Sequence, residues 1–134
     1  MVLDAPQQNI IQYFDETYDF IHHILESGDK VLVHCVAGVS RSATIVTAYL
    51  MRLNNMRYKE ALAMLKRVRP FVTPNQGFID QLRLYQTMGN RVDVNHPAYK
   101  KFLETHSNQD EERKFSYGKT CFCSWHQPSL VCVN

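Results

Sequence analysis

One cysteine and one arginine in this sequence are spaced as phosphate chemistry requires. Cys35 ends a short run of apolar and β-branched residues, and Arg41 follows it after five intervening residues. Such a loop, with Gly38 to relax the backbone, can curl so that successive N–H groups point inward and hold a phosphate dianion. An arginine at its end can bind two phosphate oxygens with its forked guanidinium. The same positive surroundings favour the thiolate of Cys35, which is the nucleophilic form.

The neighbouring residues extend this candidate site. Ser42 follows the arginine directly, where its hydroxyl can turn back to the sulfur and help the thiolate leave a covalent intermediate. His34 precedes the nucleophile, and we expect it to orient the loop or stabilise the thiolate rather than act as a base. A buried structural cysteine is the plain alternative, but the fixed offsets of His, Cys, Gly, Arg and Ser favour a catalytic loop. The predicted phosphate-binding residues are Val36, Ala37, Gly38, Val39, Ser40 and Arg41.

The elements on either side of the loop fit this prediction. Residues 30–34 predict a buried strand. Residues 42–53 predict a helix that is apolar on nearly every side and therefore belongs to the core. Further helices are predicted over residues 8–27, 58–69 and 75–88. One strand cannot form a sheet by itself, so other strands are either hidden in the pattern or absent from the chain.

Composition limits the class of protein. At 134 residues, 45% of them hydrophobic, the chain is long enough for one modest globular domain. Its formal net charge of +2 is too small to predict a nucleic acid or an anionic membrane as a partner. The apolar stretches are far shorter than the roughly 20 residues that cross a bilayer, and no secretory signal is apparent. The four cysteines, three of them near the end, do not suggest a disulfide framework. We therefore expect an intracellular protein, in the cytoplasm or the nucleus.

Residues 34–42 resemble the signature loop of the cysteine-dependent phosphatases. The continuation Ser42-Ala43-Thr44, with residues 48–51, is similar to the dual-specificity branch of that family. The resemblance implies a hydrolase that dephosphorylates phosphotyrosine and phosphoserine or phosphothreonine in proteins through a phosphocysteine intermediate, without a cofactor. Phosphatases of 3-phosphoinositides tend to carry lysines inside the loop. The apolar Val36 and Val39 disfavour that substrate, and with the near-neutral charge they also disfavour an RNA 5′-triphosphatase.

The resemblance also implies a general acid upstream of the cysteine. Asp4 matches it, because in the family this aspartate precedes a helix that opens with Asn and an apolar pair, as Asn9, Ile10 and Ile11 do in this sequence. A solvated carboxylate near the N-terminus is the alternative. Residues 74–78 match a family segment that opens the last helix. In that segment Asn75 either braces the phosphate loop or simply caps the helix.

The resemblance covers roughly residues 2–104 and only the second half of the family's domain. We therefore expect an α/β fold that is the C-terminal half of a cysteine-phosphatase fold. It would contain the central strand, phosphate loop and helix unit with its surrounding helices, and the upstream strands would be absent. The expected division is a partial phosphatase domain over residues 1–104 and a linker with a cysteine-containing tail over 105–134. A non-catalytic phosphate-binding or scaffold protein is the alternative hypothesis for such a chain.

A zinc-binding tail is a further implication of the resemblance. Residues 81–89, continuing to Tyr99 and Lys100, are similar to an atypical dual-specificity subfamily that carries a zinc-binding module after its phosphatase domain. The candidate zinc ligands are Cys121, Cys123, His126 and Cys132. Their Cys-x-Cys spacing departs from the usual Cys-x2-Cys, which favours free thiols over a zinc site. The sequence predicts a phosphoprotein substrate and no particular oligomeric state.

Overall fold

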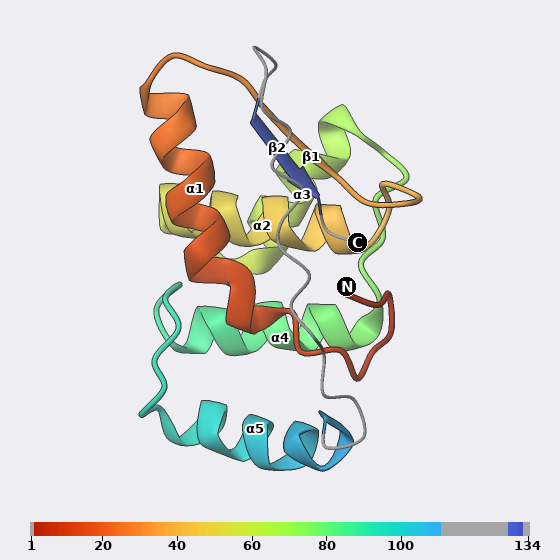
Figure 1. Cartoon of the computed structure of the whole chain (residues 1–134), viewed down its shortest axis with the longest axis vertical. Coiled ribbons are helices and arrows are strands. Elements are labelled where there is room, and N and C mark those ends of the chain that lie inside the picture. The colour runs from red at the N-terminus through yellow and green to blue at the C-terminus, as the bar shows by residue number, and fades with distance from the viewer. Residues whose placement is uncertain (1, 111–128, 133–134) are drawn as a thin grey trace.

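The structure of the chain is a computed structural model that describes residues 2–110 and 129–132 (Figure 1). Its elements follow in the order η1 (Ile11–Tyr13), α1 (Phe14–Glu26), β1 (Val31–His34), α2 (Arg41–Asn54), α3 (Tyr58–Val68), α4 (Gln76–Thr87), α5 (Pro97–Asp110) and β2 (Ser129–Cys132). The strand, loop and helix that were expected around the cysteine are therefore present as β1, residues 35–40 and α2.

The strand β1 has a partner that the sequence pattern does not reveal. The strand β2, near the end of the chain, pairs with β1 in parallel, with Val31 opposite Ser129 and His34 opposite Cys132. In Figure 1 the two strands lie side by side above α2. Of the two alternatives that the sequence leaves open, a strand hidden in the pattern is therefore the one that the structure shows. A strand of four residues is too short for its periodicity to separate it from a loop.

The helix α2 lies at the centre of the packing, as its apolar composition predicts. It packs against α1, α3, α4 and β1. The hydroxyls of Thr44 and Thr47 donate to the carbonyl oxygens of Ser40 and Ala43 at 2.8 and 2.7 Å, which satisfies both polar groups inside the core. Because α2 is enclosed on several sides, its first turn gives the preceding loop a rigid support.

One carboxylate joins four parts of the core. Asp15 in α1 accepts hydrogen bonds from the Tyr85 hydroxyl at 3.0 Å, from the Arg52 guanidinium at 3.2 Å and from the Val92 N–H at 2.9 Å. These contacts link α1 to α2, to α4 and to the segment that leads into α5. They help to place α4 relative to the helix that follows the N-terminal segment.

The helix α5 extends past the predicted domain boundary at residue 104, and the division into a domain and a tail stays a prediction. The sequence predicts a linker from residue 105, but α5 continues to Asp110. Its apolar pattern is weak because only one face packs: Tyr99 is buried in the core cluster, and Phe102 and Leu103 lie against that cluster. Residues 111–128 lie outside the part of the chain that the structure describes. They include the proposed ligands Cys121, Cys123 and His126, so the zinc site stays a prediction.

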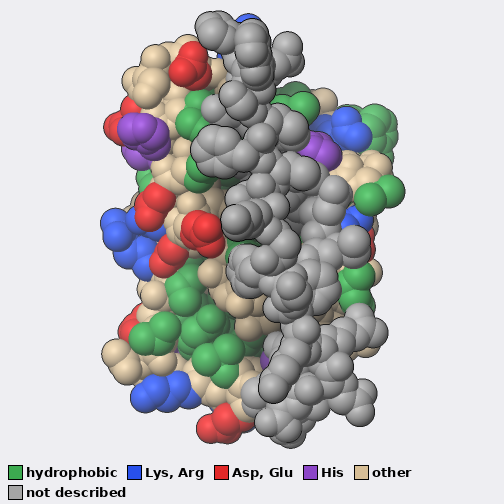
Figure 2. Space-filling model, viewed as in Figure 1, with side chains coloured by type: hydrophobic (Ala, Val, Ile, Leu, Met, Phe, Trp, Pro, Cys, Tyr) green, Lys and Arg blue, Asp and Glu red, His purple; other side chains and the backbone are tan. Residues whose placement is uncertain are grey.

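Acidic and basic side chains are interspersed on the face shown in Figure 2, in keeping with the near-balanced charge. No helix among the described residues is long and apolar enough to cross a bilayer. Within residues 2–110 and 129–132, no group of His, Cys, Asp and Glu side chains is arranged to hold a metal ion.

Candidate active site

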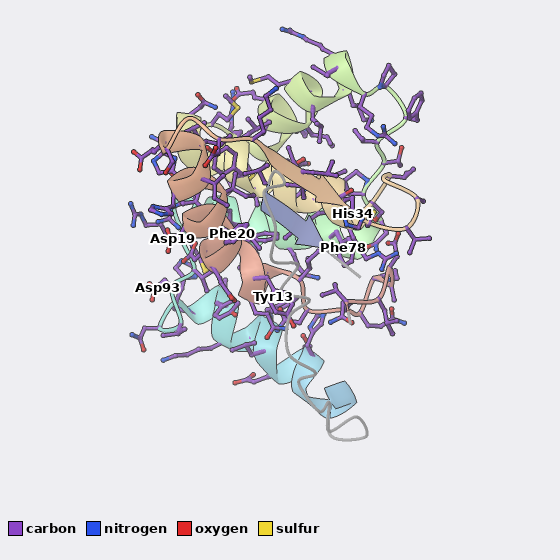
Figure 3. The ribbon with its side chains drawn as sticks, turned by 45° about the horizontal axis from the view of Figure 1, so that its top comes forward. Tyr13, Asp19, Phe20, His34, Phe78 and Asp93 are labelled. Carbon is purple, nitrogen blue, oxygen red and sulfur yellow. The ribbon has the colours of Figure 1, made fainter. Side chains whose placement is uncertain are left out.

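The loop between β1 and α2 turns its backbone toward the sulfur of Cys35. The loop leaves the end of β1 at His34, which is labelled in Figure 3, and Arg41 opens α2. Gly38 has a φ of +65°, a conformation that glycine adopts without strain. The Gly38 N–H donates to Cys35 Sγ at 3.2 Å. The curled loop expected from the sequence is therefore formed around the sulfur.

The Cys35 thiol is more acidic than an ordinary cysteine. Burial by itself raises the pKa of this thiol, but hydrogen bonds to the sulfur outweigh that effect. The Ser42 hydroxyl, 3.2 Å from Sγ, is the largest of them, followed by the backbone N–H groups of Ser42, Gly38 and Val39. Together they lower the pKa of Cys35 from 9.0 to about 7. The nucleophilic thiolate is therefore far more populated at neutral pH than it is for an ordinary cysteine.

Removing the Ser42 hydroxyl tests this assignment. In Ser42→Ala we expect the pKa of Cys35 to rise from about 7 toward 9.0, because the strongest hydrogen bond to the thiolate is lost. The rate of alkylation by iodoacetamide, measured from pH 5 to 10, follows the thiolate fraction, so its midpoint should move upward. Ser27→Ala, an exposed serine at the end of α1, is the control and should keep the wild-type midpoint. An unchanged midpoint in Ser42→Ala would contradict the role of the hydroxyl.

Arg41 is held by the N-terminal segment. Its Nη1 donates to the carbonyl oxygen of Val2 at 2.9 Å. Its Nε is buried and has no hydrogen-bond partner within the described part of the chain. A buried N–H group without an acceptor is costly, and an anionic oxygen in the loop would satisfy it. The guanidinium is therefore suited to bind a phosphate group.

Asp4 is held by one hydrogen bond to the loop and one to the cap of α4. Its Oδ1 accepts from Ser40 Oγ at 2.7 Å and from Asn75 Nδ2 at 2.8 Å. Ser40 Oγ in turn accepts from the Asn75 N–H at 3.0 Å. Asn75 also caps α4, since its Oδ1 accepts from the Phe78 N–H at 3.0 Å. Asn75 thus makes both of the contacts considered from the sequence, and the exposed carboxylate of Asp4 lies at the edge of the loop.

Two contacts from the connection between α3 and α4 also hold the loop, and the sequence does not identify them. Arg69 Nε donates to the carbonyl oxygen of Gly38 at 3.0 Å. The Thr73 N–H donates to the carbonyl oxygen of Val39 at 2.8 Å. Both bonds fix backbone carbonyls on the outside of the loop, so that its N–H groups can face inward. An arginine just after a helix is usually a solvated residue, so its type carries no signal of this role.

A cavity of about 330 Å³ adjoins the sulfur. Its lining combines Cys35, Ser42 and the loop residues Val36, Ala37 and Gly38 with apolar side chains of β1, α2 and α3. His34 lines the cavity beside Cys35, and its orienting role stays a prediction. Val36 is 84% exposed, so the loop side of the cavity opens to solvent.

Comparisons with known proteins agree with this geometry. The family model described as the catalytic domain of dual specificity phosphatases matches residues 1–88. Dual specificity protein phosphatase 22-B of Danio rerio is 49% identical over 84 residues, which are 63% of this chain and 46% of that protein. The tyrosine-protein phosphatase yvh1 of Schizosaccharomyces pombe is 43% identical over 100 residues, 75% of this chain and 30% of the relative. The chain therefore spans less than half the length of these curated relatives.

Solved structures show the same likeness. The crystal structure of the human tyrosine phosphatase-like serine/threonine/tyrosine-interacting protein matches with a TM-score of 0.63 and 44% identity, over 64% of this chain and 57% of that one. The structure of DUSP15 matches with a TM-score of 0.62 and 33% identity, over 81% of this chain and 64% of that one. The mixed α/β architecture around the cysteine loop is thus shared with these proteins.

Proposed function

Because the chain belongs to the dual specificity phosphatase catalytic-domain family, we propose that it is a protein phosphatase. It hydrolyses phosphotyrosine and phosphoserine or phosphothreonine monoesters through a phosphocysteine intermediate. The observation that supports this best is the loop around Cys35, in which the Ser42 hydroxyl and the Gly38 N–H each lie 3.2 Å from the sulfur and favour its nucleophilic thiolate. No cofactor is needed for this chemistry.

In the first step the Cys35 thiolate attacks the phosphorus of the ester. A sulfur–phosphorus bond forms as the bond from phosphorus to the ester oxygen breaks. The loop N–H groups and the Arg41 guanidinium stabilise the charge on the three other oxygens in the transition state. Asp4, in its protonated form, gives its proton to the leaving oxygen, which departs as an alcohol or a phenol.

In the second step water regenerates the enzyme. The Asp4 carboxylate accepts a proton from a water molecule as the water oxygen attacks the phosphorus. The sulfur–phosphorus bond breaks, inorganic phosphate is released and the Cys35 thiolate returns. The Ser42 hydroxyl, 3.2 Å from Sγ, stabilises the departing thiolate by a hydrogen bond.

The role of Asp4 has a test that separates acid catalysis from folding. For Asp4→Asn we expect kcat/KM for phenyl phosphate to fall about a hundredfold, because phenolate is a poor leaving group without a proton. With the phosphate ester of a strongly acidic, polyfluorinated phenol, which leaves without protonation, kcat/KM should change less than about threefold. Asp29→Asn, in the exposed turn before β1, is the matched control and should behave as wild type with both esters. Equal losses for the two esters in Asp4→Asn would contradict acid catalysis by Asp4.

Several finer assignments belong to this proposal. The substrate is a phosphoprotein, and we propose no nucleic acid or membrane partner, in keeping with the near-balanced charge. We also propose an intracellular location. We further propose that the chain resembles the atypical subfamily with a zinc-binding module. In the complete domain of its relatives, further strands would lie upstream of the part that this chain matches. If the folded chain binds a phosphotyrosine peptide without hydrolysing it, the non-catalytic alternative replaces the phosphatase function.

A further inference from the structure

The side chain of Gln81 in α4 is a buried polar group that the catalytic steps do not use. It is 1% exposed and lies among the apolar residues of the helix face that packs into the core. Its Oε1 accepts hydrogen bonds from the N–H groups of Ile10 and Ile11 at 2.8 and 2.9 Å. Its Nε2 donates to the carbonyl oxygen of Gln8 at 2.8 Å. One side chain thus binds three backbone groups of a segment about 70 residues away in the sequence.

These bonds replace a helix cap that the segment itself lacks. Ile10 is the residue before η1, and it makes no side-chain capping bond of its own. The first N–H groups of a helix have no partner within the helix. Ile10 and Ile11 are both 0% exposed, so water cannot satisfy their N–H groups. Gln81 supplies the missing acceptor from another helix, and it fixes the place where the N-terminal segment joins the core.

The same segment carries Asp4 and runs alongside the first turns of α4. Asp4 accepts a hydrogen bond from Asn75, the cap of α4, and Ile10 and Ile11 bond to Gln81 further along the helix. Between them the Pro6 carbonyl lies directly against Gly77. In Figure 1 this segment passes the N-terminal end of α4 before it enters α1. Asp4 is exposed, so besides its own bonds to Ser40 and Asn75 its position depends on how firmly the rest of the segment is held.

We propose that Gln81 is a positioning residue for the acid step, which holds the segment of residues 4–11 so that the Asp4 carboxylate faces the leaving group. The inference rests on the proposed function of Asp4 as the general acid. A glutamine suits the place because its amide accepts two N–H groups with one atom and donates to a carbonyl with the other. An apolar residue of similar size would fill the same volume and leave the three backbone groups unpaired.

The test compares two esters in a variant that keeps the volume of the side chain. In Gln81→Met we expect kcat/KM for phenyl phosphate to fall about tenfold, because the displaced Asp4 protonates the leaving oxygen less well. With the ester of the strongly acidic, polyfluorinated phenol, kcat/KM should stay within about twofold. Equal losses for both esters, or no loss for either, would overturn the proposal, because a purely structural role does not depend on the leaving group. If Gln81→Met does not fold, Gln81→Glu provides the same comparison, since its carboxylate keeps the acceptor but loses the donor.

Two further variants separate the possible causes of a loss of kcat/KM in Gln81→Met. Gln86→Met is the matched control: Gln86 is also in α4, but its Oε1 accepts from the Tyr58 N–H at 3.1 Å and so holds α3 rather than the acid segment. It should show no dependence on the leaving group. Asp4→Asn, measured in parallel, tests the proposed function itself. If Asp4→Asn discriminates between the esters and Gln81→Met does not, the positioning role fails and the function of Asp4 stands. If Asp4→Asn fails to discriminate, the general acid has been assigned wrongly.

Discussion

Replacing Cys35 with serine is expected to reduce the hydrolysis of phenyl phosphate by at least about a thousandfold. The serine hydroxyl is not ionised at neutral pH, and the hydrogen bonds that lower the pKa of Cys35 to about 7 cannot make it a comparable nucleophile. Phosphate binding should persist, because the loop N–H groups and the Arg41 guanidinium are unchanged. The measurement is steady-state hydrolysis, with inhibition by vanadate as the wild-type signature, beside calorimetric titration with a phosphotyrosine peptide.

The control for this variant is Val68→Ala at the end of α3. Val68 is 86% exposed and does not line the cavity at Cys35. It should hydrolyse the ester at the wild-type rate. Turnover by Cys35→Ser close to that of the wild type would remove the cysteine from the mechanism. A loss of both turnover and peptide binding would instead indicate that the serine disrupts the loop.

Replacing Gly77 with alanine is expected to destabilise the chain by about 1–3 kcal/mol. Helix propensity alone predicts the opposite, since alanine is favoured over glycine inside a helix by about 1 kcal/mol. The steric clash decides the sign of the change in stability, because a Cβ on Gly77 would overlap the carbonyl oxygen of Pro6. A backbone atom cannot turn away from such a clash as a flexible side chain can. The segment that carries Asp4 must then move off α4. Thermal unfolding followed by circular dichroism should show a lower Tm, by about 4–8 °C for each kcal/mol, and kcat/KM for phenyl phosphate should fall.

Gly28→Ala is the matched comparison for Gly77→Ala. Gly28 has a φ of +80°, but a Cβ there would meet no atom within 4 Å. This variant carries a cost of backbone strain of about 1 kcal/mol and no clash, and the acid segment is not involved. We expect a smaller loss of stability and an unchanged kcat/KM. A Gly77→Ala protein as stable and active as the wild type would show that the contact with Pro6 does not constrain the segment.

The chemistry at the centre of the site is largely determined by the sequence. The anion-binding loop is built from consecutive backbone N–H groups between one strand and one helix, so its geometry is local. The five residues between Cys35 and Arg41, with Gly38 at a φ of +65°, supply the loop, and Arg69 and Thr73 hold it in place. The Ser42 hydroxyl follows from the same local register. For this reason the residues that contact the sulfur could be named before the structure was known.

The surroundings of the loop are decided by tertiary structure. The sequence resemblance suggested Asp4 and Asn75, but only the fold joins them through Ser40. The bonds of Gln81 to Ile10 and Gln8 connect residues about 70 positions apart, and the pairing of β2 with β1 joins the end of the chain to its middle. The type of a residue shows that it can donate or accept a hydrogen bond, whereas its partner depends on which segments the core brings together. The loop chemistry is therefore local in origin, and the placement of the acid is a property of the packed chain.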